Sequence, residues 1–370
     1  MDNCMDFLDL LEPDMSLQIL HSLEDPVDLV RISAVSRSWW HFVVANGLCK
    51  QLCLRMFPQL LKVACVIEID NSETEGCGEA GSSSNQSQWE SLARDHRVYA
   101  FLLRGSRSFG AGNCISAAIS ASSTDNYPEE SIRNTLDPRE VVSRRASYWS
   151  SKGQKNSEVP ETLVYKLVSD FCIIDEIQIK PFEAFFQLGL PIYSAKAVRF
   201  RLGYCKSPMQ LESNSMDESC HDDKCIWTYT SQVFPMIQAN CLQSFKLPEP
   251  VLCIGGYLQI ELLGRVQRQE MDGLFYICIS HVKVLGRSLS PAFGVNVLDP
   301  SGQFELKRYQ QVTEAAQLKS VENKPYANQM VHLVQRVRDL QQIVNILREN
   351  DLEYVWEDDE ENESDEELFL

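Results

Sequence analysis

The sequence predicts an α+β fold: an N-terminal unit of three short helices, then an antiparallel β-sandwich or jelly roll, then a C-terminal helix with an acidic tail. Near the N-terminus, apolar residues recur at the spacing of amphipathic helices. From about Gly112 onwards, short runs rich in Val, Ile, Tyr and Phe alternate with turn residues. Many short strands without intervening helices are typical of a sandwich rather than of a parallel sheet.

Each of the three N-terminal helices has its own start signal. Asp14 precedes the first apolar run. Asp25 caps the second run, with Pro26 at its first helical position, and Ser36 opens the third. Helices shorter than about 12 residues are not stable alone in water, so these must pack on one another or on a partner. Their apolar surface exceeds what so small a unit can bury, which is typical of an interaction site.

This helical unit resembles the F-box, the motif that docks a protein onto the Skp-type adaptor of a cullin–RING ubiquitin ligase. The resemblance covers roughly residues 6–48, with a trailing helix to Phe57, and rests on DPVDL at 25–29 and VSRSW at 35–39. The sequence departs from the family pattern at two places. Pro13 stands one position later than in the family's Leu-Pro start, and Glu24 is an extra residue before the DPVDL turn.

The resemblance implies which side chains contact the adaptor. They are the residues at the apolar positions of the motif, namely Leu11, Pro13, Leu17, Ile19, Leu20, Leu23, Pro26, Leu29, Val35 and Trp39. The implied partners are the Skp-type adaptor and, through it, the cullin. The alternative is an ordinary three-helix subdomain that packs on the rest of the chain.

Composition predicts the domain boundaries. Residues 70–88 are rich in Ser, Gly, Glu and Asn, which is typical of a linker, and helical spacing resumes at Trp89. Strand-like runs continue to about residue 290. The predicted parts are an F-box at 1–60, a linker and packing helix at 61–104, the sandwich at 105–290, a connector and amphipathic helix at 291–350, and a disordered acidic tail at 351–370.

The predicted C-terminal helix has an apolar seam of about two and a half heptads. Three uses remain open for it: packing on the sandwich, dimerisation, or binding a partner helix. Between residues 349 and 367 there are twelve acidic and no basic residues, which leaves −6 of the net charge of −18 for the rest of the chain. Since no basic face is apparent, a nucleic-acid partner is not predicted.

The strand-rich part resembles the discoidin or galactose-binding-like jelly roll. The resemblance covers roughly residues 112–288, with an insertion near 206–224, and rests on Ala121-Ser122-Ser123 and on YWSSKG at 148–153. Taken together, the two resemblances are to a plant F-box protein with a discoidin-like C-terminal domain. An unrelated β-sandwich is the alternative for this part.

Recognition in such a sandwich is expected at loops that a rigid scaffold presents at one end. The candidate loops are Ser122 to Asn126, the turn from Phe185 to Pro191, and the 206–224 insertion. The turn supplies the candidate substrate-binding residues Phe185, Phe186 and Leu190, since apolar side chains are unusual in a turn unless they contact something. The alternative is that they pack beneath the sandwich or against the helix near Trp89.

The motifs of common enzymes are absent from the sequence. It contains no GxSxG, no P-loop and no HExxH, so no catalytic residue and no cofactor is predicted. Cys220, His221 and Cys225 are the one cluster that hints at a metal, but they lack a regularly spaced fourth ligand, and no metal is predicted.

The expected location is the cytoplasm, the nucleus or both. Thirteen scattered Cys suit reduced, buried thiols better than a disulfide framework. The first residues lack the basic and apolar segments of a signal peptide, and no apolar run approaches the ~18 residues of a membrane span.

Three functions are compatible with these features. The first is a non-catalytic substrate-recognition adaptor of an SCF-type ubiquitin ligase, whose sandwich presents an unidentified protein substrate. The second is an intracellular module that binds a carbohydrate or another ligand. The third is an enzyme of unrecognised type. The absence of catalytic motifs favours the first two.

Overall fold

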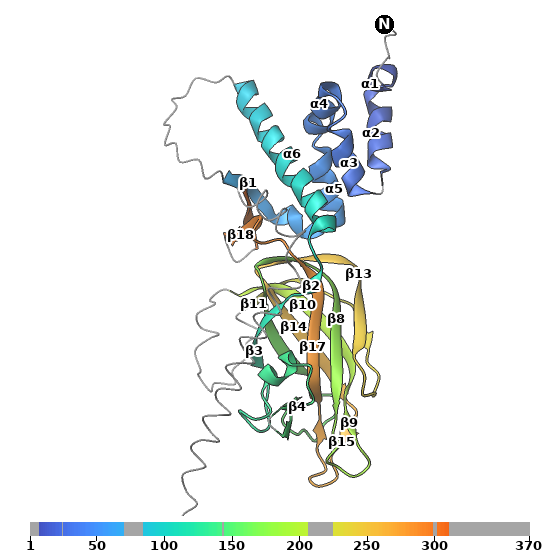
Figure 1. The fold of residues 1–370 in the computed structure, drawn as a ribbon, viewed down its shortest axis with the longest axis vertical. Helices are drawn as coiled ribbons and strands as arrows, with labels where there is room; N and C mark the ends of the chain where they lie inside the picture. The colour runs from blue at the N-terminus through green and yellow to red at the C-terminus, as the bar shows by residue number, and fades with distance from the viewer. Residues whose placement is uncertain are drawn as a thin grey trace, which may run out of the picture. The chain divides into compact units, whose positions relative to one another are not determined.

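The computed structural model describes residues 7–23, 25–69, 84–142, 144–205, 225–298 and 302–310 (Figure 1). Contacts divide the chain into two units, residues 1–311 and 312–370, and all described residues belong to the first. The predicted C-terminal helix, the acidic tail and the 206–224 insertion lie outside the described residues. No described helix is long and apolar enough to span a membrane.

Short helices make up the N-terminal part, and the three predicted ones are confirmed as α2, α3 and α4. Asp25 caps α3, because its carboxylate accepts a hydrogen bond from the Val27 N–H at 2.9 Å. Ser36 caps α4 by accepting from the Trp39 N–H at 3.2 Å. The bounds are α1 Phe7–Leu10, α2 Pro13–His21, α3 Pro26–Ile32, α4 Arg37–Ala45, α5 Leu48–Met56, the 3-10 helix η1 Pro58–Lys62 and α6 Ser84–Ser108.

The start of the first predicted helix differs from the expectation. Helix α2 begins at Pro13, one residue before Asp14, and its N-cap is Glu12. Proline suits this first helical position, since its fixed φ is already helical and its missing N–H is not needed there.

Helix α6 is the predicted packing helix, and it begins at Ser84, inside the predicted linker. Val98, Tyr99 and Leu102 of α6 are buried in one apolar cluster with Leu48 and Leu52 of α5. The same cluster includes side chains from the near end of the sandwich. The interior of the helical unit, which α6 completes, is therefore continuous with the near end of the sandwich.

Two antiparallel sheets form the predicted sandwich (Figure 1). One sheet has the order β11-β10-β14-β7-β3, with β12 beside β10; the other has the order β13-β8-β17-β2, with β6 beside β17 and β9 beside β8. The bounds are β2 Gly112–Asn113, β3 Ile115–Ala121, β6 Trp149–Ser150, β7 Glu161–Leu167, β8 Phe171–Glu183, β9 Ile192–Tyr193, β10 Ala195–Cys205, β11 Cys225–Thr230, β12 Phe234–Pro235, β13 Gln243–Ile254, β14 Tyr257–Arg265 and β17 Cys278–Ser288.

Alternation along the strands builds the core between the two sheets. Leu258, Ile260 and Leu262 of β14 project every second side chain into it, as the period of a strand requires. Trp149 of β6 is fully buried in the same core. The sandwich also carries a 3-10 helix and two hairpins. They are η2 (Ile132–Leu136), β4–β5 (Val141–Val142 and Arg145–Ala146) and β15–β16 (Gln267–Arg268 and Phe275–Tyr276).

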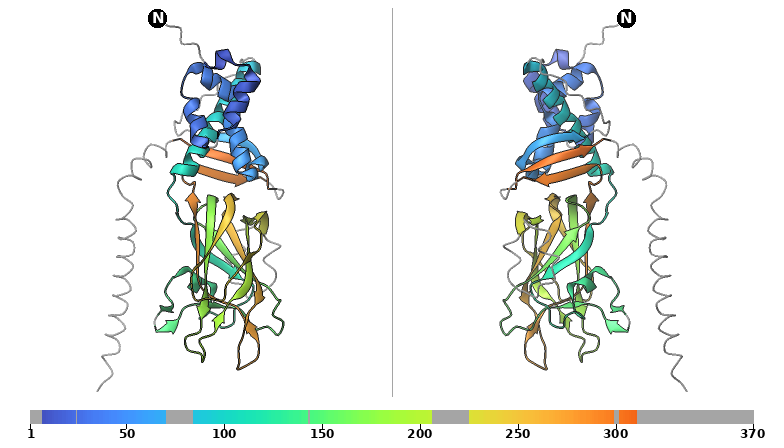
Figure 2. Two further views of the ribbon diagram at one scale, coloured as in Figure 1. Left: turned by 90° about the vertical axis from the view of Figure 1, so that its right-hand side faces the viewer. Right: turned by 90° about the vertical axis from the view of Figure 1, so that its left-hand side faces the viewer.

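A third sheet occupies segments that the sequence analysis assigned to a linker and a connector. Its order is β1-β19-β18, with β1 Val63–Ile69, β18 Phe293–Val297 and β19 Phe304–Tyr309 (Figure 2). Strands β1 and β19 are parallel, and Glu68 binds Arg308 across a sequence separation of 240 residues. Local patterns do not reveal such distant pairing, so the prediction of a plain connector from residue 291 was wrong for β18 and β19.

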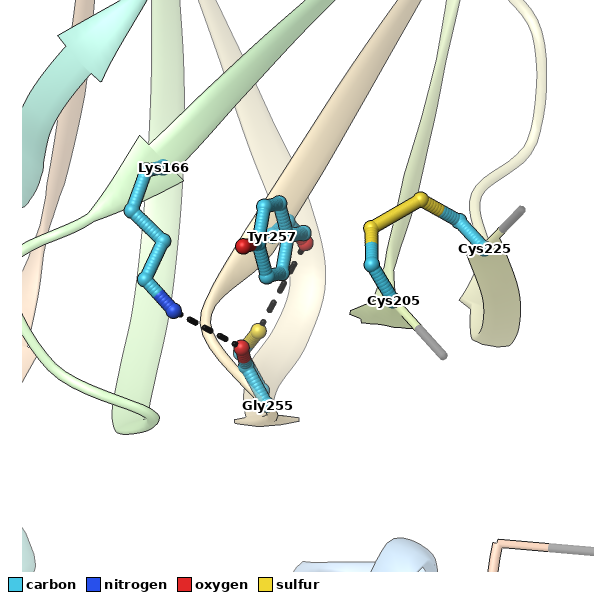
Figure 3. Close-up of a disulfide and its surroundings, with 6 residues drawn as sticks. Lys166, Cys205, Cys225, Gly255 and Tyr257 are labelled. Atoms are coloured by element: carbon cyan, nitrogen blue, oxygen red, sulfur yellow. Dashed lines mark hydrogen bonds between the residues drawn. A yellow bond between two sulfur atoms is a disulfide. The ribbon is translucent and has the colours of Figure 1, made fainter. Parts of the chain in front are cut away.

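One pair of cysteines contradicts the expectation of reduced thiols. Cys205 of β10 faces Cys225 of β11 in the antiparallel register, and the two form a disulfide with a Cα–Cα distance of 4.0 Å (Figure 3). The bond also removes Cys225 from the cluster that hinted at a metal, and Cys220 and His221 lie outside the described residues. Within the described ranges, no group of three or more His, Cys, Asp or Glu could hold a metal ion.

Strand β14 is anchored beside this disulfide. Lys166 of β7 donates to the Gly255 carbonyl oxygen at 3.3 Å, and its ammonium lies 4.3 Å from the centre of the Tyr257 ring (Figure 3). A cation at this distance from an aromatic face is attracted to it. The contact fastens the turn before β14 to the neighbouring strand.

Candidate functional site

The residues predicted to bind an adaptor fall into two groups in the structure. Leu20, Pro26 and Leu29 are buried, and both leucines belong to the apolar cluster of the helical unit. Because these three side chains are buried, they pack inside the helical unit and are not available on its surface. Four further predicted residues are half-buried, namely Leu11, Leu17, Leu23 and Trp39.

The remaining predicted residues are exposed. Ile19 of α2 is 42% exposed and Val35, just before α4, is 67% exposed; Pro13 is exposed too. Two further exposed residues were missed by the sequence analysis, Leu10 and Met15. Met15 lies one helical turn before Ile19, a spacing that could have revealed it. We name Leu10, Pro13, Met15, Ile19 and Val35 the helical apolar set.

The second candidate site is a pocket of about 160 Å³ at the loop end of the sandwich, where Figure 1 labels β9 and β15. Asp125 and Asn126 line it from one predicted loop, and Phe186 and Gln187 from another. The structure therefore brings two of the three predicted loops together. The third, 206–224, lies outside the described residues.

The β15–β16 hairpin supplies a wall of the pocket that the sequence analysis missed. Gln269 and Tyr276 line the pocket from this hairpin. The signal for its turn was the Asp272-Gly273 pair, a dipeptide typical of hairpin turns. Gly273 has a positive φ of 69°, which glycine adopts without strain.

The predicted substrate-binding residues combine packing with exposure. The rings of Phe185 and Phe186 each lie 6.1 Å from the ring of buried Phe182, yet both side chains are exposed, as is that of Leu190. Leu188, in the same turn, is 99% exposed, and Met271, at the tip of the β15–β16 hairpin, is 93% exposed. We name Phe185, Phe186, Leu188, Leu190 and Met271 the apolar rim.

Aromatic rings form much of the pocket wall. Tyr148 stacks on Phe182 with a centroid distance of 3.9 Å, and Tyr193 meets Tyr276 edge to face at 6.3 Å. Three of these residues are tyrosines, so the wall carries hydroxyl groups as well as ring faces. The Tyr148 hydroxyl donates to the Glu130 carboxylate at 2.6 Å.

Carboxylates determine the electrostatics of the pocket. Asp125 and Glu130 line it, and Asp272 accepts a hydrogen bond from the Tyr276 hydroxyl at 2.5 Å. Burial raises the pKa of Asp125, and the negative charges of Glu130 and Asp272 raise it further, whereas Lys152 lowers it. Among the described residues that line the pocket there is no Lys or Arg.

Comparison with known proteins gives the family. No family model matches the chain. An F-box protein of Arabidopsis thaliana is 49% identical to it over 370 residues, with 97% of each chain covered. This chain belongs to the F-box proteins. The predicted resemblance to a plant F-box protein is thereby confirmed, and helices α2 to α4 of this F-box protein carry its DPVDL and VSRSW motifs.

Among solved structures, the chain is similar to carbohydrate-binding modules. The family 32 module of Clostridium perfringens NanJ, solved with galactose, is 12% identical with a TM-score of 0.29, covering 45% of this chain and 97% of that one. The family 32 module of Streptococcus pneumoniae EndoD is 12% identical with a TM-score of 0.31, covering 47% and 98%. The assignment of an antiparallel sandwich in this F-box protein rests on its own strand order.

Proposed function

We propose that this F-box protein is a non-catalytic substrate-recognition adaptor of an SCF-type cullin–RING ubiquitin ligase. The helical unit binds the Skp-type adaptor and, through it, the cullin, while the sandwich presents a protein substrate. One observation carries the proposal: α2 to α4 form a family-typical unit that buries Leu20 and Leu29 yet leaves Ile19 and Val35 exposed. Exposed apolar side chains gathered on one small unit are typical of a binding surface.

Co-purification with a plant Skp-type adaptor tests this proposal. The double variant Ile19→Asp/Val35→Asp introduces two charges where apolar contact is expected, and we expect adaptor recovery to fall by about tenfold or more. The matched control is Leu61→Asp, because Leu61 is also exposed but belongs to η1, outside the helical apolar set. Equal recovery of adaptor by the double variant and the control would contradict the proposal.

The pocket favours a second candidate, an intracellular module that binds a carbohydrate or another small ligand. Its aromatic walls and a few convergent polar groups are the usual features of a ligand site. Saturable binding of a simple sugar such as methyl galactoside to the full chain, without adaptor, would support this candidate. The absence of binding at millimolar sugar would remove it.

We also propose that the protein acts in the cytoplasm, the nucleus or both, where free thiols are maintained. Eight cysteines in the described part of the chain are free, and six of these are buried. Imaging of a fluorescent fusion in plant cells tests this, and accumulation in the secretory pathway would contradict it.

A further inference from the structure

We propose that the loop-end pocket binds the cationic side chain, Lys or Arg, of a polypeptide substrate, while apolar residues beside that cation contact the apolar rim. This inference rests on the proposed function, since it names the class of substrate that the sandwich presents. It is carried by three independent features: the cavity, the charge of its lining, and the exposure of its rim.

The cavity has the shape and lining that a long cationic side chain requires. Its volume of about 160 Å³ is lined by aromatic side chains, including those of Tyr148, Tyr276 and Phe186. The aliphatic stem of Lys or Arg packs on apolar surface while its charged head reaches polar groups. Aromatic faces attract cations as well. The walls therefore suit both parts of such a side chain.

The charge of the lining selects a cation. Asp125 and Glu130 lie in the wall, with Asp272 close enough to raise the pKa of Asp125. The nearby cations lie outside the lining: Lys152 lowers the pKa of Asp125, Arg268 donates to the Gly273 carbonyl oxygen at 2.6 Å, and Arg265 is buried in an ion pair with Glu161. A cation in the pocket would relieve the repulsion among these carboxylates, whereas an anionic ligand would increase it.

The exposure of the apolar rim favours a polypeptide ligand over a monosaccharide or a membrane surface. Leu188 and Met271 are almost fully exposed at the tips of two hairpins that both contribute to the pocket. A monosaccharide within the pocket would leave these aliphatic tips without a partner. A cell membrane would accept the tips, but its anionic headgroups would repel the carboxylates. A peptide with apolar residues beside a Lys or Arg satisfies both features.

Selection from a random peptide library displayed on phage tests the proposal, with the full-chain protein in complex with its adaptor as bait. We expect Lys or Arg to be enriched about tenfold or more over the unselected library at one position, with apolar residues beside it. The best peptide is then synthesised with norleucine in place of that cation. We expect its affinity for the protein to fall about tenfold or more, because norleucine keeps the stem and loses the charge.

Isosteric variants locate the binding site. In Asp125→Asn/Glu130→Gln, the amide of Gln can still accept from the Tyr148 hydroxyl, so the fold is retained; an unchanged melting temperature confirms this. We expect this variant to bind the selected peptide about tenfold or more weakly. Glu129→Gln is the control, because it removes one carboxylate charge from the same loop but does not line the pocket. It should leave peptide affinity unchanged.

Four results would overturn the proposal. They are that no peptide is selected, that the selected peptides lack a cation, that Asp125→Asn/Glu130→Gln binds them normally, or that a competitor displaces them from the pocket. The competitors are methyl galactoside and vesicles that contain phosphatidylserine. Adaptor recovery is measured for the same variants. If only Ile19→Asp/Val35→Asp loses adaptor binding and the peptide selection fails, the proposed adaptor function is correct and the proposed ligand is incorrect.

Discussion

Arg265 and Glu161 form an ion pair inside the loop end of the sandwich, and neither side chain is more than 3% exposed. The Arg265 guanidinium also donates to the Ser151 hydroxyl at 2.9 Å and to the carbonyl oxygens of Lys152 and Phe275 at 2.9 and 3.0 Å. The second carboxylate oxygen of Glu161 accepts from the hydroxyls of Ser122 and Ser123. The pair thus joins three segments that lead into the pocket.

Removing the cation of this pair should destabilise the whole sandwich. Arg265→Met leaves the Glu161 carboxylate buried without its partner, and we expect a loss of about 3–5 kcal/mol in the free energy of unfolding. Urea unfolding of the full chain measures it. The double variant Arg265→Met/Glu161→Gln should recover part of the loss, because it removes the uncompensated charge as well.

The control for this prediction is a surface ion pair. Lys196 binds Glu158, and both side chains are more than half exposed. Such exposed pairs contribute little to stability, so Lys196→Met should shift the urea midpoint only slightly. Equal shifts for Arg265→Met and Lys196→Met would show that the buried pair does not organise the loop end.

Neighbouring residues of α2 should respond in opposite ways to truncation. Leu20 is buried in the helical unit, so Leu20→Ala should cost about 2–5 kcal/mol of stability. Ile19 is exposed, and Ile19→Ala should change stability by no more than about 0.5 kcal/mol. Thermal unfolding without adaptor measures both effects. If Ile19→Ala destabilised the chain as much as Leu20→Ala, the assignment of these two side chains to surface and interior would be incorrect.

Acid should weaken the fold through His281. Burial lowers the pKa of His281 in the folded chain, although its hydrogen bond with the Thr135 carbonyl oxygen acts in the opposite direction. The unfolded chain, with an ordinary His pKa of about 6.5, therefore binds the proton more readily. The contribution of neutral His281 to stability is fully present above the pKa of the unfolded state. It is lost as the pH falls through that pKa and towards the pKa of the folded state.

A variant isolates this contribution. His281→Asn keeps a group that can donate to the Thr135 carbonyl oxygen but does not titrate. The fall in melting temperature between about pH 7.5 and about pH 5.5 should be smaller in His281→Asn than in the natural chain. The exposed residue His41 provides the control variant His41→Gln. An identical fall in all three proteins would exclude a role for His281.

Short-range signals explain which parts of the fold could be predicted from the sequence. The caps Asp25 and Ser36 and the short runs rich in Val, Ile, Tyr and Phe act over a few residues, so the sequence alone reveals them. The family motif placed Ser122 and Ser123 near one end of the sandwich, but their shared acceptor, Glu161, could not be foreseen. Gly153 belongs to the same motif, and a Cβ there would lie 2.6 Å from the Tyr276 ring.

Long-range pairing explains what the sequence analysis missed. The β1–β19 pair and the Cys205–Cys225 disulfide depend on registers that form only in the folded chain. Arg265 carries a charge at the end of a strand, which ordinarily indicates solvent exposure. The adaptor-binding residues were predicted as one set because a motif gives residue types and not burial. The structure divides that set into interior and surface.

The apolar rim provides the last prediction, which concerns substrate recruitment. Phe186→Ser/Leu188→Ser removes two exposed apolar side chains, so we expect the melting temperature and adaptor recovery to stay unchanged. Proximity labelling in cells treated with a proteasome inhibitor should lose the substrate proteins that the natural chain labels, because the altered rim no longer contacts them. Labelling of the adaptor should persist, because the helical apolar set is a separate surface. Val233→Ser is the matched control, since Val233 is also exposed on the sandwich but does not line the pocket. Should the double variant lower the melting temperature strongly, the turn would serve packing under the sandwich. Should it label the same proteins as Val233→Ser, recognition would lie elsewhere on the chain.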